Sequence, residues 1–122
     1  PCHGEDGRGV SPIAPPLAGS EWVKGKKERL MALVLYGLTG PVEVAGHTYE
    51  TPEVSGEMPG IVHNPAIEDA ELAELLSYIR NAWGNNVDDQ ILPEDLGAIR
   101  SRFGDRAEPF VQSELHELFG KD

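Results

Sequence analysis

The chain has 122 residues, the size of a single domain with one modest hydrophobic core. Its formal net charge of −11 argues against nucleic-acid binding, which requires a basic surface. No apolar run approaches the roughly 18 residues that cross a bilayer, so no membrane span is expected in this segment. The single cysteine excludes an internal disulfide framework.

The acidic charge is unevenly distributed. Eight acidic and five basic residues give residues 1–61 a net charge of −3, whereas thirteen and five give residues 62–122 a net charge of −8. The simple interpretation is a solvated surface that keeps the protein soluble. The alternative is an acidic face that steers a basic partner protein.

The first half of the chain predicts one helix among loops. Residues 4–20 hold seven glycines and prolines and predict a loop. A helix is predicted over about residues 26–37, where apolar residues recur at helical spacing. Residues 41–50 alternate apolar and polar side chains about Ala45-Gly46, which predicts a short hairpin or extended excursion. Residues 50–66 predict another loop.

The second half predicts three helices. The clearest covers about residues 68–83, with acidic residues in its first turn and Gly84 as its stop signal. Its apolar stripe comprises Leu72, Leu75, Leu76, Ile79 and Trp83. A third helix is predicted over about 94–103, with Pro93 suited to the first helical position, and a last short piece over about 111–119. We therefore divide the chain into a domain over 1–86 and a helical extension over 87–122, which is too small for a core of its own.

The first residues carry a chemical signature. Cys2 followed by His3 is the second half of the C-x-x-C-H haem-attachment motif. In that motif two thiols add across the haem vinyl groups, and the histidine that follows lies on the axial line of the iron. A lone Cys-His pair is more commonly structural, so this half-motif needs support from elsewhere in the chain.

Three further segments supply that support. Residues 14–19 (APPLAG) alone would be a proline-rich surface turn. Met58 stands among glycines and prolines without periodic apolar neighbours, so core filling explains it poorly, whereas Met31 lies in a helical stripe. The third segment is ELLSYIRNAWGN, residues 74–85.

In this order and at these intervals, the segments resemble class I c-type cytochromes with one haem. The likeness is greatest to the cytochrome subunits and domains that accompany bacterial quinoprotein dehydrogenases, and it covers about residues 1–86. It implies an all-α class I cytochrome c fold, in which a few helices and long loops, with a possible short β-hairpin, surround one haem. It also implies an exported or periplasmic protein, because haem c is attached outside the bacterial cytoplasm.

The resemblance also implies a set of site residues. The haem c iron would lie between His3 and Met58, with Cys2 in a thioether bond. The carbonyl of Pro15, or alternatively of Pro16, would accept a hydrogen bond from the imidazole of His3. The remaining positions expected against the haem are Leu17, Leu35 and Tyr49.

The chain departs from the family pattern at its start. The first cysteine of the motif would lie two places ahead of Pro1, and the helix that precedes it in the family is also missing. We therefore expect the parent protein to continue upstream with a C-x-P-C-H segment. Without that helix, the apolar stripe of residues 68–83 would lack its usual partner.

Several functions remain open at this point. The favoured one is a one-electron carrier with His/Met ligation and a redox partner protein. The alternative is the C-terminal cytochrome domain of a larger quinoprotein dehydrogenase of the sugar or alcohol type, whose catalytic groups would lie upstream. A haem-based sensor needs an open distal site, which Met58 argues against. A helical domain without a cofactor is the fourth possibility.

The other histidines offer rival ligands. His63 is the strongest rival to Met58, because bis-histidine ligation is known haem chemistry. His47 in the hairpin and His116 in the acidic tail are expected to be solvated or hydrogen-bonded at the surface.

Overall fold

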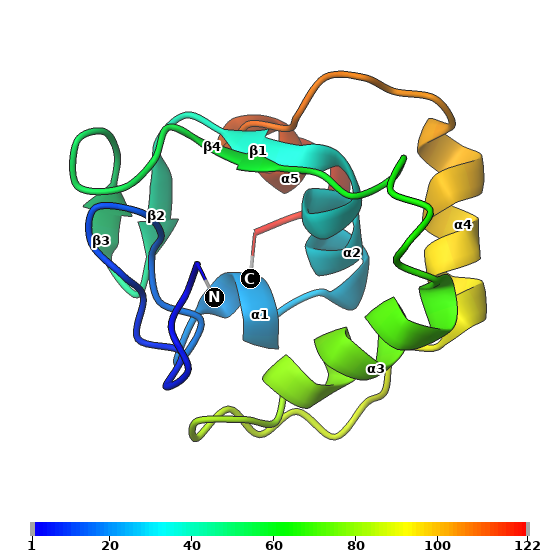
Figure 1. Ribbon diagram of the computed structural model, residues 1–122, viewed down its shortest axis with the longest axis horizontal. Coiled ribbons are helices and arrows are strands. Elements are labelled where there is room, and N and C mark those ends of the chain that lie inside the picture. The colour runs from blue at the N-terminus through cyan, green and yellow to red at the C-terminus, as the bar shows by residue number, and fades with distance from the viewer. Residues whose placement is uncertain (1, 122) are drawn as a thin grey trace.

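The computed structural model describes residues 2–121. Five helices and four short strands are arranged around one hydrophobic core (Figure 1). The helices are α1 (Glu21–Lys24), α2 (Lys27–Tyr36), α3 (Asp69–Ile79), α4 (Pro93–Phe103) and α5 (Gln112–Phe119). The strands are β1 (Gly37–Thr39), β2 (Val42–Val44), β3 (His47–Tyr49) and β4 (Glu57–Pro59). None of the helices in the described range is long and apolar enough to cross a membrane.

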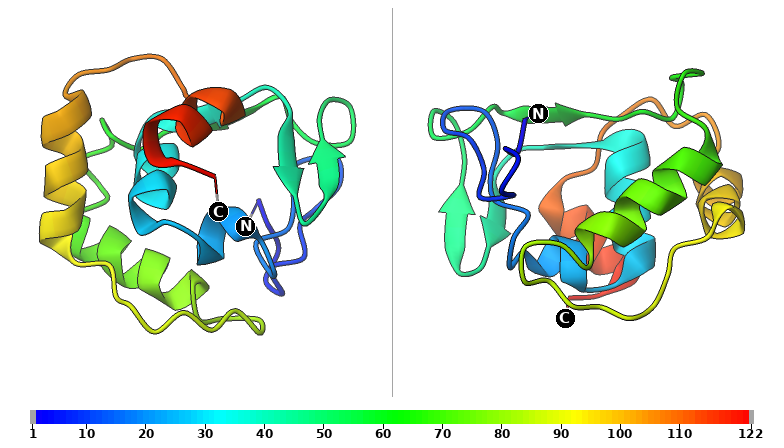
Figure 2. Two further views of the ribbon diagram at one scale, coloured as in Figure 1. Left: turned by 180° about the vertical axis from the view of Figure 1, so that it is seen from behind. Right: turned by 60° about the horizontal axis from the view of Figure 1, so that its bottom comes forward.

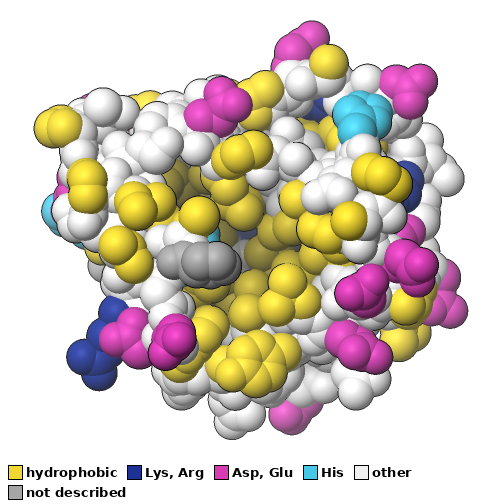
Figure 3. All heavy atoms as spheres, in the orientation of Figure 1, with side chains coloured by type: hydrophobic (Ala, Val, Ile, Leu, Met, Phe, Trp, Pro, Cys, Tyr) yellow, Lys and Arg dark blue, Asp and Glu magenta, His cyan; other side chains and the backbone are white. Residues whose placement is uncertain are grey.

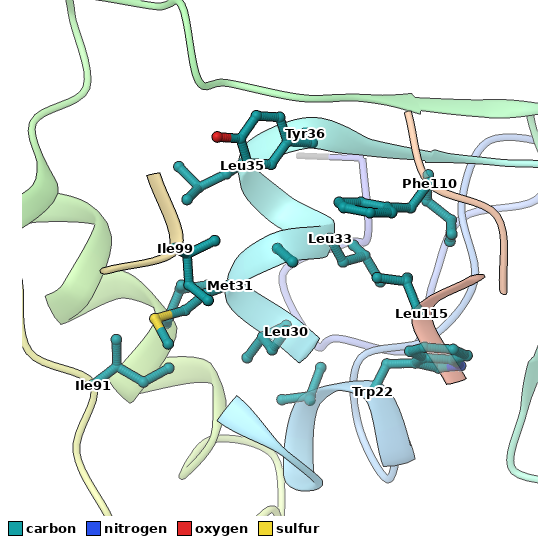
Figure 4. Packing of buried hydrophobic residues seen from close by; sticks show 14 of the residues in the cluster. Trp22, Leu30, Met31, Leu33, Leu35, Tyr36, Ile91, Ile99, Phe110 and Leu115 are labelled. Atoms are coloured by element: carbon teal, nitrogen blue, oxygen red, sulfur yellow. The ribbon is translucent and has the colours of Figure 1, made fainter. Parts of the chain in front are cut away.

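Helix α2 forms the centre of the core. It was predicted by its apolar spacing, and seven of its ten residues are buried, so it is covered on almost every side. It packs against α1, α4 and α5. From behind, α5 crosses α2 (Figure 2), and side chains of α2 meet Ile99 of α4 as well as Phe110 and Leu115 (Figure 4). Met31 is 1% exposed, which confirms its place in the core.

The predicted extension is part of this same core. Helices α4 and α5 begin and end within one residue of the predicted bounds, and Pro93 occupies the first turn of α4. The buried apolar residues that the segment contributes are Ile91, Leu96, Ile99, Phe110 and Leu115. The described part of the chain therefore shares one core from α1 to α5.

Helix α3 is shorter than predicted. It ends at Ile79, and Trp83 lies beyond it with a φ of +53°, so the stop signal at Gly84 comes too late. The predicted stripe is also wrong at two positions, Leu75 and Trp83. Leu75 is 54% exposed, and Ala73 is buried in its place. Trp83 leaves the stripe because it packs on the N-terminal loop, where its Nε1 bonds the Glu5 carbonyl.

The strands go beyond the predicted all-α fold, which allowed for one short β-hairpin. The predicted hairpin is present as the antiparallel pair β2–β3, with Ala45 and Gly46 between the strands. A second antiparallel pair joins β1 to β4, placing Leu38 opposite Met58. Strand β4 lies in a stretch that was predicted to be loop. These residues have glycine and proline neighbours, and their pairing with β1 is a long-range contact that local sequence does not encode.

Candidate functional site

His3 is held by the carbonyl of Pro15. Its Nδ1 atom lies 2.6 Å from the Pro15 oxygen. A carbonyl oxygen can only accept a hydrogen bond, so Nδ1 must carry a proton, and in the neutral ring Nε2 then holds the lone pair. The imidazole is thereby fixed in the tautomer and orientation in which Nε2 can bind a metal.

The loop around His3 is tied together by its own backbone. The amide of Gly9 donates to the His3 carbonyl at 2.8 Å. Gly7 accepts from the amides of Leu17 and Ala18 at 2.7 and 2.8 Å. The Gly9 bond therefore closes the loop that begins at His3, and the Gly7 bonds link this loop to the segment that follows Pro15.

Trp83 fastens this loop to the end of α3. Its Nε1 donates to the carbonyl of Glu5 at 2.9 Å. The indole lies so close to Gly7 that a Cβ at that position would overlap its ring atoms, and Gly7 itself has a φ of +68°. Only glycine satisfies both demands there. The sequence indicated Trp83 as part of a helical stripe, whereas its contacts are with the N-terminal loop.

Asn85 provides a second tie that the sequence did not reveal. It is 3% exposed. Its Oδ1 accepts from the Gly19 amide at 2.8 Å, and its Nδ2 donates to the carbonyls of Leu17 and Ile79 at 3.2 and 2.9 Å. One buried amide thus joins the segment after Pro15 to the last residue of α3. A polar residue in a loop gives no local signal of such burial.

Met58 lies on β4, close to the end of α2. It is half-buried and packs against the core. The approach of the two segments is tight, since a Cβ on Gly37 would lie 2.6 Å from the Met58 carbonyl oxygen. At Gly60 an added Cβ would collide with the backbone of Tyr36. Two glycines therefore allow the methionine-bearing strand to lie directly on the β1 end of α2.

A hollow opens between these parts of the molecule. In the orientation of Figure 1, β1 and β4 run above it and α3 below it. Figure 3 shows that hydrophobic side chains line this hollow in the middle of the face. A concave, predominantly apolar site with a few polar groups is typical of cofactor binding.

The other predicted site residues occupy different environments. Cys2 is exposed and carries a free thiol. Pro16 is half-buried, and Leu17 and Tyr49 are half-buried against the core. Leu35 is fully buried in α2, where its side chain lies among the core residues (Figure 4).

The remaining histidines have partners or lie at the surface. His47 contacts Glu53 at the surface, with 2.8 Å between Nε2 and Oε1. His63 is exposed in the segment after β4. His116 is half-buried and stacks on Trp22, with ring centroids 5.0 Å apart.

These residues fit a covalently held haem c. The exposed Cys2 thiol and the oriented His3 imidazole are adjacent in the chain, as the attachment chemistry requires. The tautomer of His3 leaves its iron-binding nitrogen available. The apolar hollow (Figure 3) offers the water-excluding surface that a macrocycle needs.

Comparison with known proteins gives the same result. Residues 1–83 match the Cytochrome c family. Cytochrome c-552 of Thermus thermophilus is 36% identical over 88 residues, which cover 69% of this chain and 61% of that protein. The cytochrome c subunit of the quinone alcohol dehydrogenase of Gluconobacter oxydans is 30% identical over 102 residues, covering 82% of this chain and 20% of that subunit.

The site and the fold therefore define a haem protein of the c type. The chain belongs to the cytochrome c family, whose cofactor is covalently bound haem c with iron. It spans less than two thirds of the length of the relatives that it matches.

Proposed function

We propose that this chain is the haem-carrying part of a one-electron carrier, with His3 and Met58 as the axial ligands of the iron. The observation that carries the proposal is the 2.6 Å contact between His3 Nδ1 and the Pro15 carbonyl oxygen. It gives the histidine the tautomer of a proximal ligand. Membership in a family of electron-transfer cytochromes supports the same reading.

Each residue then has a defined task. Haem c supplies an iron that alternates between ferrous and ferric states. His3 binds through Nε2 while Pro15 holds its Nδ1 proton and raises the basicity of the ring. Met58 would supply a neutral thioether as the second ligand, which favours the ferrous state relative to a second imidazole.

The other predicted residues hold the haem itself. Cys2 anchors it through a thioether bond. The side chains proposed to pack against it or to shape its pocket are Pro16, Leu17, Leu35 and Tyr49. If His3 and Met58 both hold the iron, the haem would exchange electrons at its edge and would leave no position for a substrate.

A further helix is proposed to cover the exposed face of α3. Leu75 and Tyr78 are 54% and 61% exposed there, which is unusual for large apolar side chains on a core helix. Trp83 contacts the ring of Tyr78 on this face and donates to the Glu5 carbonyl, so the loop at Glu5 lies beside it. The helix that precedes the attachment motif in this family would fit over it.

A second candidate is the C-terminal cytochrome domain of a larger quinoprotein dehydrogenase. It is favoured by the match of 82% of this chain to the cytochrome c subunit of a quinone alcohol dehydrogenase. In that case the redox partner is a dehydrogenase, supplied in the same or another chain. In both cases we propose an exported or periplasmic protein, since haem c is attached there.

Carbon monoxide distinguishes a carrier from a sensor. The protein should be made in a haem-attachment strain with a complete C-x-x-C-H motif. We expect a one-electron redox titration and at most slow binding of carbon monoxide to the reduced protein. Rapid carbon monoxide binding would indicate an open distal site and contradict the proposal, as would a preparation with an intact motif that acquires no haem.

A further inference from the structure

Arg100 of α4 is hydrogen-bonded to the segment that follows Met58. Its Nη1 donates to the carbonyl of Val62 at 3.0 Å. Its Nε and Nη2 lie 3.0 and 2.9 Å from Oδ1 of Asp69, in the first turn of α3. One guanidinium therefore joins both ends of the stretch 62–69 to α4.

The same stretch is held from its other side by α2. The amide of Val62 donates to the Leu35 carbonyl at 2.8 Å, and the amide of Ile61 donates to the Val34 carbonyl at 3.3 Å. Val62 is thus fixed through both its amide and its carbonyl. Without Arg100, residues 61–62 would depend on their hydrogen bonds to α2.

Phe110 supports the methionine strand from a second direction. Its carbonyl accepts from the Thr39 amide at 2.8 Å, and its amide donates to the Gly37 carbonyl at 2.9 Å. Leu38 of β1 therefore lies between Met58 of β4 on one edge and Phe110 on the other. Phe110 is fully buried, so the backbone contact that it makes with β1 is anchored in the core.

Both supports lie outside the part of the chain that matches the cytochrome c family, which ends at residue 83. We infer that residues 87–122 act as a brace for the axial methionine, with Arg100 as a positioning residue that keeps the Met58 segment closed over the iron. The inference rests on the proposed His3/Met58 ligation. A thioether is a weak neutral ligand. The fraction of molecules in which Met58 is bound to the iron would therefore depend on how seldom the Met58 segment moves away from it.

The chemistry of arginine explains why this residue suits the task. Its planar fork can donate to a carbonyl and to a carboxylate at once, which a lysine ammonium does less well. Loss of a hydrogen bond that involves a charged group should change an opening equilibrium by roughly tenfold or more.

Arg100→Gln tests the inference, with Arg102→Gln as the matched control. Arg102 lies on the same helix but is exposed and rests over the rings of Phe103 and Phe119. In the haem-loaded protein we expect carbon monoxide to bind reduced Arg100→Gln about tenfold faster than Arg102→Gln or the parent. The methionine-to-iron charge-transfer band of the oxidised protein should disappear well before global unfolding on heating. Arg100→Lys should be intermediate.

Hydrogen exchange provides a readout that does not depend on the iron. The Val62 amide should exchange about tenfold faster in Arg100→Gln and unchanged in Arg102→Gln. Equal carbon monoxide rates and equal Val62 exchange in the two variants would overturn the inference while leaving the ligation intact. Absence of the charge-transfer band from the parent protein would instead refute the ligation, and the brace with it.

Discussion

The Nδ1 atom of His3 lies 2.6 Å from the carbonyl oxygen of Pro15, twelve residues along the chain. This contact depends on the loops around it, because neither residue is part of a helix or a sheet. Asn85 and Trp83 connect those loops to the end of α3. The orientation of the histidine is therefore set by residues about 80 positions away in the sequence.

Removal of the Asn85 amide should loosen the proximal side. Asn85→Ala leaves the Gly19 amide and two carbonyls without their buried partner. We expect a loss of about 1–3 kcal/mol in the free energy of unfolding by urea. The reduction potential should also rise, because a weaker hydrogen bond to Pro15 makes His3 a less basic ligand for ferric iron.

Asn81→Ala is the control for this change. Asn81 is exposed and donates one hydrogen bond, to the Ser77 carbonyl. Its replacement should alter stability by less than about 0.5 kcal/mol and leave the potential unchanged. Equal effects of the two substitutions would show that the buried hydrogen bonds of Asn85 matter no more than the exposed one of Asn81.

The close approach of β1 and β4 requires glycine at position 37. Gly37 has φ +93° and ψ +170°, a region that residues with a Cβ rarely enter, and its added Cβ would lie 2.6 Å from the Met58 carbonyl oxygen. Gly37→Ala should cost about 3 kcal/mol or more in unfolding free energy, from backbone strain and overlap together.

Gly40→Ala measures the cost of backbone strain without the steric overlap that Gly37→Ala adds. Gly40 also has a positive φ, of +81°, but an added Cβ would meet nothing within 4 Å. Its replacement should cost only about 1–2 kcal/mol. Thermal or urea unfolding measures both variants, and a Gly37→Ala protein as stable as Gly40→Ala would show that β4 can move away without penalty.

Tyr36 is expected to make the stability of the fold depend on pH in the alkaline range. Its hydroxyl donates to the Gly104 carbonyl at 2.9 Å, and burial raises the pKa of the phenol above its ordinary value of about 10. Below pH ~10 both the folded and the unfolded chain keep the proton, so its contribution is complete there. As the pH rises further, the unfolded chain ionises first and stability is lost.

Tyr36→Phe should remove this pH dependence. At neutral pH the variant should lose about 1 kcal/mol, because the hydrogen bond to Gly104 is missing. Above pH ~10 the parent should lose stability faster than the variant, so the difference between them shrinks. A difference that stays constant with pH would contradict the expectation.

The acidic second half of the chain predicts salt-sensitive electron transfer. Residues 62–122 carry a net charge of −8, from thirteen acidic and five basic residues. A basic redox partner would be attracted at low ionic strength, and salt screens this attraction over about 10 Å at 0.1 M. The second-order rate of electron transfer should therefore fall as salt rises. A rate that is independent of salt would mean that the charge serves solubility alone.

The sequence predicted those elements whose signals are local. Helices α2, α4 and α5 follow from apolar spacing and from Pro93, because such helices form where one face can be buried. The β2–β3 hairpin follows from alternation about Ala45 and Gly46.

Long-range contacts account for what the sequence did not reveal. Helix α3 ends early because Trp83 is recruited to Gly7, and the pairing of β1 with β4 joins segments about twenty residues apart. The hydrogen bonds of Asn85 and Arg100 likewise depend on the assembled core. The site residues themselves were found through family resemblance, since Cys2-His3 and Met58 are each ambiguous alone.

The identity of the sixth ligand is the most direct test of the proposed function. The measurement is the methionine-to-iron charge-transfer band in the oxidised, haem-loaded protein, compared between Met58→Ala and His63→Ala. We predict that the band is lost in Met58→Ala and retained in His63→Ala. A band that survives in Met58→Ala, or spectra that change only when His63 is replaced, would contradict an iron held between His3 and Met58.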